Sequence, residues 1–249
     1  MGVFAGPEDW WTEGTDKGRT HVATKGVVQD GLVLNLDAGV SNSYSGSGTT
    51  WTDLSSSSNN GTIYQASFSD NKFSFDGTDD KVDLASTFSI TNNFSVELWC
   101  LPEATHQIDT QATSGTTGTA NKKYILGANF VGSPDAGFGI SIGTNGVSTY
   151  EHSASYMPSL MVYETTITSF TQIVIAYTNK QPSLYINGNF IKTGLTSPRT
   201  NVYLLGNLIG YGSYGYYQGQ LAILREYDKS LTASEVKQNF NALRGRFGI

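Results

Sequence analysis

Short runs of alternating apolar residues, separated by polar turns, follow one another along most of this chain and limit what it can fold into. The stretch 73–84 is the clearest example, with two such runs on either side of the acidic turn Asp76–Asp80. Apolar residues at every second position place one face of a strand in a core, and Asp-Gly between two such runs favours a hairpin. We therefore expect a hairpin here. Its predicted core residues are Phe73, Phe75, Val82 and Leu84.

The composition favours an all-β chain. Charged residues make up only 14% of the 249 residues, whereas the 28 Gly and 14 Tyr suit many short strands joined by turns. All-β sandwiches often reach this length as one domain. The net charge of −6, without a cluster of Lys and Arg, argues against a nucleic-acid partner.

The ends and the cysteine content limit the location and the chemistry. The single cysteine, Cys100, excludes an intrachain disulfide and a cysteine-based metal site, and we expect it to be buried in its strand. The first residues have no basic region followed by an apolar run, and no window approaches 18 apolar residues. We therefore expect neither secretion nor a membrane partner.

Residues 1–30 differ from the rest and are predicted to form an N-terminal arm. Trp10 and Trp11 lie there among acidic and basic residues, without a period of either kind. The tryptophans either cover part of the same domain, as tied-down termini do, or anchor the arm on a neighbouring subunit as a docking or oligomerisation segment. The sequence favours neither.

Residues 31–249 are predicted to form one sandwich. The segment 170–177 is the most apolar strand and is expected to be central, and 183–192 is expected to be a hairpin around a type I′ turn at Asn187-Gly188. The stretch 105–123 is a long polar loop containing His106, and such loops are usually functional or disordered.

One short helix is expected to close the chain. Thr232 as N-cap and Glu235 three residues later form a capping box, and Leu231 and Val236 occupy the positions of a hydrophobic staple. The residues predicted to face the sandwich at helical spacing are Val236, Phe240, Leu243 and Phe247.

Six segments in order resemble the laminin-G-like domains of the concanavalin A-like lectin/glucanase superfamily. They are 31–39, 51–62, 75–82, 94–99, 170–188 and 219–236. The resemblance covers about residues 30–249 and implies a jelly-roll β-sandwich with a short C-terminal helix. Because this fold is shared by enzymes, lectins and scaffolding modules, it does not by itself give the function.

Within that superfamily, residues 37–54 and 239–249 are similar to a version seen in structural proteins of tailed bacteriophages. This narrower likeness implies a virion protein made in the host cytoplasm, either a capsid decoration or a fibre or appendage component. Its partners would be other virion proteins, further copies of itself and a cell-surface glycan. The alternatives are a free carbohydrate-binding lectin module and a glycan-degrading enzyme.

The sequence argues against catalysis. Glucanases of the superfamily carry a Glu-x-Asp-x-x-Glu strand, because glycoside hydrolysis needs facing carboxylates. No such pattern occurs here: the nearest acid-bearing strand supplies the single carboxylate Glu97 among apolar neighbours, and His21, His106 and His152 lie in separate polar contexts. We therefore expect a protein that is not an enzyme.

The densest acidic cluster, Asp76, Asp79 and Asp80, is the candidate metal site. Carboxylates on a turn suit Ca²⁺, but Asp also bonds its own backbone in turns. At the closing strand, relatives of the fold often carry an acid where this chain has Ala222. We therefore expect no cofactor, with calcium at this turn as the alternative.

The candidate glycan-binding residues lie in one aromatic loop. They are Tyr211, Tyr214, Tyr216 and Tyr217. Tyrosines among Gly and Ser combine rigid aromatic anchors with adaptable polar contacts. The alternative is that these side chains pack on the sandwich edge or on another subunit. Trp51 and Trp99 lie on predicted strands and are expected to be core residues.

Overall fold

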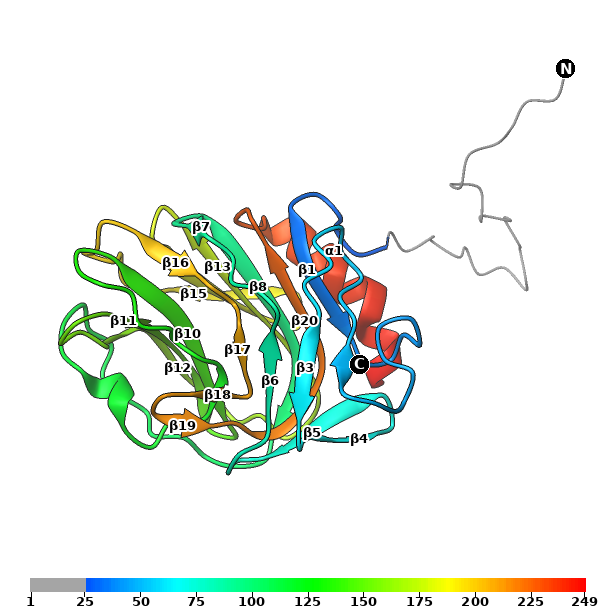
Figure 1. The fold of residues 1–249 in the computed structure, drawn as a ribbon. Coiled ribbons are helices and arrows are strands. Elements are labelled where there is room, and N and C mark those ends of the chain that lie inside the picture. The colour runs from blue at the N-terminus through cyan, green and yellow to red at the C-terminus, as the bar shows by residue number, and fades with distance from the viewer. Residues whose placement is uncertain (1–25) are drawn as a thin grey trace, which may run out of the picture.

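Two sheets lie face to face in the computed structural model, which describes residues 26–249 (Figure 1). The eight-stranded sheet is antiparallel throughout, and β1 (Leu32–Asp37) pairs with β20 beside the main path. In order across the sheet, that path is β15 (Asn189–Thr193), β14 (Gln181–Ile186), β13 (Thr171–Thr178), β8 (Phe94–Pro102), β20 (Gln218–Tyr227), β5 (Lys72–Asp76) and β4 (Ser67–Ser69).

The ten-stranded sheet forms the second layer. Its main path is β12 (Ser159–Glu164), β11 (Gly146–His152), β10 (Ala136–Gly143), β9 (Tyr124–Leu126), β17 (Leu208–Ile209), β6 (Lys81–Leu84), β3 (Gly61–Tyr64) and β2 (Thr50–Trp51). Beside this path, β16 (Val202–Leu204) pairs with β10 and with β7 (Ile90–Thr91). A separate two-stranded piece, β18 (Tyr211–Gly212) and β19 (Gly215–Tyr216), follows β17 in the chain.

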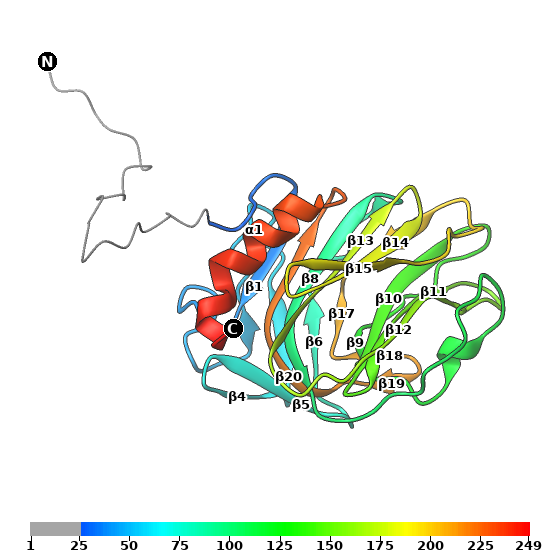
Figure 2. The same ribbon diagram turned by 180° about the vertical axis from the view of Figure 1, so that it is seen from behind.

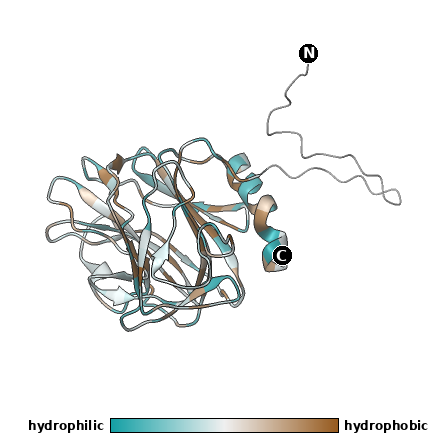
Figure 3. Ribbon diagram, turned by 45° about the vertical axis from the view of Figure 1, so that its right-hand side comes forward, coloured by the Kyte–Doolittle hydropathy of each residue, from teal (hydrophilic) through white to brown (hydrophobic). Residues whose placement is uncertain are grey.

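The core lies between the two sheets. On β8, Val96, Leu98 and Cys100 alternate toward the interior, and all three are fully buried. Figure 3 shows apolar segments along the facing strands of both layers, as alternating burial requires. The predicted all-β jelly-roll sandwich and the burial of Cys100 are confirmed, as is the inner position of the strand 170–177, which forms most of β13 between β8 and β14.

The predicted helix is present as α1 (Ala233–Leu243) and is followed by the 3₁₀ turn η2 (Arg244–Phe247). Both bonds of the Thr232–Glu235 capping box form. The helix crosses the outer face of the eight-stranded sheet (Figure 2), where Phe240 and Phe247 stack on Trp99 with ring centroids 5.9 and 4.3 Å away. Trp99 is therefore a core residue as predicted, in a second core beneath the helix.

A buried polar network also holds α1 on the sheet. Glu97 is fully buried, and its Oε1 accepts hydrogen bonds from Gln172 Nε2 (2.7 Å) and Trp99 Nε1 (3.2 Å). Asn239 of the helix donates to Glu97 Oε2 at 2.8 Å, and Arg225 lies 3.7 Å from the same oxygen. The single strand carboxylate is thus used to attach the helix.

The predicted hairpin at 73–84 is wrong in its pairing. β5 pairs with β4 and β20 of one sheet, whereas β6 pairs with β3 and β17 of the other, so the turn Asp76–Asp80 carries the chain between the sheets. The four predicted core residues are nevertheless buried. Alternation determines which face of a strand is inside, and it does so equally for paired strands and for strands in facing sheets.

The hairpin predicted at 183–192 is confirmed. β14 and β15 pair on either side of Asn187-Gly188, whose φ values of 50° and 72° are those of a type I′ turn. No helix of the described residues is long and apolar enough to cross a membrane.

Most of the predicted N-terminal arm lies outside the described residues, including Trp10 and Trp11, so its docking role stays a prediction. Of its last residues, Val28 is buried beside Tyr227 and Val236, and its backbone N–H donates to Asn239 Oδ1 at 2.8 Å. Val28, which precedes the expected boundary at residue 31, is therefore packed on the folded body.

Candidate functional site

The outer face of the ten-stranded sheet is covered by a long loop, residues 103–123, which contains only one short turn, η1 (Thr117–Thr119). His106 Nδ1 lies 2.8 Å from Ser141 Oγ of β10, and the Tyr150 hydroxyl of β11 donates to Asp109 at 2.6 Å. Asp109 also forms an ion pair with Lys122 at 2.8 Å, with both side chains buried. The loop is therefore packed and ordered. Of the two expectations for a long polar loop, function and disorder, the second does not apply.

The aromatic hairpin, residues 211–216, lies against this loop. Tyr211 pairs with Tyr216 across β18 and β19, and their rings stack with centroids 5.9 Å apart. Gly215 has φ +153°, and a Cβ at this position would overlap the carbonyl oxygen of Lys122. Only glycine allows so close an approach of two backbones, so this residue places the hairpin beside loop 103–123.

A larger cavity of about 560 Å³ opens where the loop, the aromatic hairpin and the acidic turn meet. Its walls are polar, with amide, imidazole and ammonium groups beside the two tyrosine rings. The lining residues are Gly77, Thr105, His106, Gln107, Asn121, Lys122, Lys123, Tyr214, Gly215 and Tyr216. A concave site with aromatic and convergent polar groups is the usual form of a small-molecule site.

His106 is a buried polar group in the wall of the larger cavity. Its Nε2 has no hydrogen-bond partner among the described residues. Burial, together with the positive charge of Lys122, lowers the pKa of His106 to about 4, against the opposing effect of Asp109. The imidazole is therefore neutral near pH 7 and offers a hydrogen bond rather than a charge.

The structure separates the four predicted tyrosines. Tyr214 and Tyr216 line the larger cavity, and Tyr214 at the hairpin turn is 36% exposed. Tyr211 stacks on Tyr216 and donates its hydroxyl to Asp83 at 2.7 Å. The prediction of Tyr217 as a glycan-binding residue is wrong. Its side chain is fully buried in the core against Phe75, so it cannot contact a surface ligand.

A smaller cavity of about 250 Å³ lies on the other side of Tyr214, which lines both. Phe130, His152 and Tyr214 form a row of rings, with His152 in the middle at centroid distances of 5.4 and 5.6 Å. The other lining residues are Thr116, Thr119, Ser153, Ser155, Tyr156 and Met157.

No sequence pattern singled out Phe130 or His152 as site residues. Phe130 is a single aromatic residue in a polar loop, and His152 appeared isolated among polar residues. They come together because the β9–β10 loop returns beside the end of β11, where the Val131 N–H donates to the His152 carbonyl at 3.3 Å. A contact across 22 residues leaves no periodic signal.

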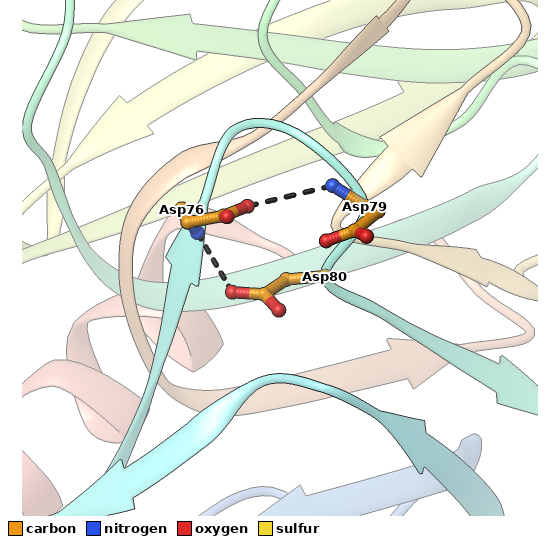
Figure 4. Close-up of side chains that lie close together, drawn as sticks. All are labelled: Asp76, Asp79 and Asp80. Atoms are coloured by element: carbon orange, nitrogen blue, oxygen red, sulfur yellow. Dashed lines mark hydrogen bonds between the residues drawn. The ribbon is translucent and has the colours of Figure 1, made fainter.

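The acidic turn is arranged as in Figure 4. Asp76 accepts backbone hydrogen bonds from Thr78 (2.7 Å) and Asp79 (3.4 Å), and Asp80 accepts one from the Asp76 N–H at 2.8 Å. The Thr78 N–H lowers the pKa of Asp76, while burial raises that of Asp80. One carboxylate oxygen from each aspartate lies within 4.8 Å of the others. The self-bonded turn is present as expected, and calcium binding stays a prediction.

Comparisons with known proteins agree with this architecture. Domain 4 of AbnA, a GH43 extracellular arabinanase from Geobacillus stearothermophilus solved in complex with arabinotriose, superposes with a TM-score of 0.58 at 17% identity over 85% of this chain and 99% of that domain. The botulinum neurotoxin type G receptor-binding domain superposes with a TM-score of 0.57 at 17% identity, over 85% of this chain and 51% of the toxin domain. Trypanosoma rangeli sialidase superposes with a TM-score of 0.56 at 15% identity, over 87% of this chain and 33% of the sialidase.

The chain thus spans nearly all of the arabinanase domain, about half of the toxin domain and a third of the sialidase. At these identities the likeness is one of fold. No curated protein matches the sequence. The model of one family, however, matches residues 75–237, which is more than half of the chain. The chain belongs to the concanavalin A-like lectin/glucanases superfamily.

Proposed function

We propose that this chain is a non-catalytic glycan-binding protein whose ligand occupies the larger cavity. The observation that carries the proposal is the position of the aromatic hairpin, which holds Tyr214 and Tyr216 in the wall of a polar cavity. A sugar ring has an apolar C–H face and a rim of hydroxyls, so it suits aromatic faces with hydrogen-bonding groups beside them. Gln107, Asn121 and Lys123 supply such groups here.

The composition of the walls supports binding rather than hydrolysis. Neither cavity has an Asp or Glu among its lining residues in the described part of the chain. Asp109, which lies close by, is paired with Lys122 and accepts the Tyr150 hydroxyl. Glycoside hydrolysis by the usual routes needs two carboxylates about 5–10 Å apart across the bond that is cleaved.

The proposed setting is the particle of a tailed bacteriophage, as a capsid decoration or as part of a fibre or appendage. The support is the resemblance of residues 37–54 and 239–249 to structural proteins of such phages. The partners would be other virion proteins and further copies of this chain. The rival is a free lectin module, a role compatible with the fold that this chain shares with arabinanase domain 4.

Glycan binding is tested with the full chain on a glycan array, followed by calorimetry with the best ligands. Tyr214→Ala should weaken binding at least about tenfold, a loss of about 1.4 kcal/mol. Tyr64→Ala is the matched control, because Tyr64 is 43% exposed on β3 and lines neither cavity, so this variant should bind like the wild type. Wild-type protein that binds no glycan, or a Tyr214→Ala variant of full affinity, would overturn the proposal.

The virion role has its own experiment. Mass spectrometry of purified phage particles should detect this chain in stoichiometric amount, and its absence would leave the free lectin module. Deleting residues 1–25, which lie before the described body, tests the docking arm: assembly onto the particle should fail while glycan binding persists. Unimpaired assembly would refute the docking role.

A further inference from the structure

The smaller cavity has an exposed aromatic ring and polar groups that do not line the larger cavity. Phe130 is 62% exposed in its wall, and its ring stands edge-on to His152. The loop carrying it is held on both sides of the ring, because Asn129 Nδ2 donates to Asn207 Oδ1 at 2.8 Å and the Val131 N–H donates to the His152 carbonyl. A rigid exposed ring is a preorganised stacking surface that loses little entropy on binding.

Two polar groups face the same region. His152 Nδ1 lies 2.9 Å from the carbonyl oxygen of Ala128 and must donate to it, so in the neutral ring Nε2 is a hydrogen-bond acceptor. Ser153 is only 2% exposed, and its Oγ has no partner among the described residues. A buried hydroxyl without a partner is costly unless a ligand or solvent completes its bonding.

The size and charge of the smaller cavity limit its ligand. At about 250 Å³ it is below the ~300–1,000 Å³ typical of independent ligand sites. It adjoins the 560 Å³ cavity, however, with Tyr214 lining both. None of its lining residues carries a carboxylate, an ammonium or a guanidinium group. The ligand that fits this cavity is a neutral, hydroxyl-rich ring with an apolar face.

We propose that the smaller cavity is a second sugar subsite and that the ligand is a neutral oligosaccharide spanning both cavities across Tyr214. This inference rests on the proposed function. One sugar ring stacks on Phe130, one of its hydroxyls donates to His152 Nε2, and another is bonded to Ser153 Oγ. The next sugar units pass Tyr214 into the larger cavity.

The test is calorimetry with neutral oligosaccharides of one to six units, built from glucose, xylose, galactose, mannose or arabinose. For the series that binds, affinity should rise with length until both cavities are filled. Phe130→Ala should remove that rise, about tenfold for the longer ligands, and leave the shortest binding ligand unaffected. Phe190→Ala is the matched control: Phe190 is 55% exposed and stands edge-on to Tyr185 on the eight-stranded sheet, and its loss should change nothing.

Each outcome bears on a different step. Phe130→Ala protein with the full dependence on length would overturn the second subsite while leaving glycan binding in the larger cavity intact. Wild-type protein that prefers sialylated or uronic-acid glycans over neutral ones would overturn the neutral class. Wild-type protein that binds no glycan would overturn this inference together with the proposed function.

Discussion

The most quantitative prediction concerns Glu226, a glutamate buried inside the sandwich. Its side chain is fully buried, and neither carboxylate oxygen has a hydrogen-bond partner among the described residues. The carboxyl group lies against Gly206, where a Cβ would overlap it. Burial, with a further contribution from the negative charge of Asp53, raises the pKa of Glu226 to about 8 from an ordinary value of 4.5.

This shift makes stability depend on pH with a definite sign. Between pH 4.5 and about 8 the unfolded chain has lost the Glu226 proton, whereas the folded chain keeps it. The contribution of Glu226 protonation to the free energy of unfolding is complete at low pH and is lost as the pH rises toward the pKa of the folded state. At about 1.4 kcal/mol per unit, the full loss is about 5 kcal/mol, of which about 3.5 kcal/mol falls between pH 5 and 8.

The perturbation is Glu226→Gln, which keeps the shape and removes the titration. Urea unfolding at pH 5, 6, 7 and 8 should show the free energy of unfolding falling with pH in the wild type and falling about 3.5 kcal/mol less in the variant. Glu151 contributes a remaining slope in both proteins, because burial raises its pKa to about 7. Glu164→Gln, at an exposed position, should leave the wild-type slope unchanged.

The decisive result is the comparison between the two proteins of the slope of unfolding free energy against pH. Replacing the carboxyl by an amide can also change stability by a constant amount, but this amount is the same at every pH and leaves the slope unaffected. Wild-type and Glu226→Gln curves that stay parallel from pH 5 to 8 would refute the reasoning. A Glu226→Met variant provides a second check, because it removes the titration without adding amide donors that need partners.

Three further predictions concern local features. Thr232→Ala removes the side-chain cap of α1 and should cost about 1 kcal/mol, or about 2–4 °C in melting temperature; an unchanged midpoint would contradict it. Gly215→Ala forces a Cβ into the carbonyl oxygen of Lys122 and should displace the aromatic hairpin, lowering glycan affinity, whereas Gly245→Ala has open space and should bind normally. If the acidic turn binds Ca²⁺, 1–5 mM calcium should raise the melting temperature relative to EDTA and Asp79→Asn should abolish the rise; equal melts would leave only the self-bonded turn.

Local features of this chain were predictable because their causes are local. The N-cap of α1 and the type I′ turn at Asn187-Gly188 depend on residues within a few positions of one another. The burial of Phe73 and Val82 follows from alternation alone. The strand partners at 73–84 were missed because alternation carries no information about which sheet a strand joins.

The candidate site was predictable only in part. The four tyrosines of the 211–217 segment look alike in sequence, but Tyr217 begins the approach to β20 and lies in the core, while Tyr214 sits at the hairpin turn and is exposed. Phe130 and His152 showed no pattern at all. Their contact depends on how the β9–β10 loop returns beside the end of β11.

The sequence by itself therefore determined the class of fold, the positions of most strands, the capped helix and the inward-facing residues. Each of these follows from propensity, periodicity or a bond between near neighbours. The tertiary structure alone decided the sheet to which each strand belongs, the aromatic rings that reach solvent and the side chains that share a cavity. Those outcomes depend on packing between distant segments, whose geometry no local pattern records.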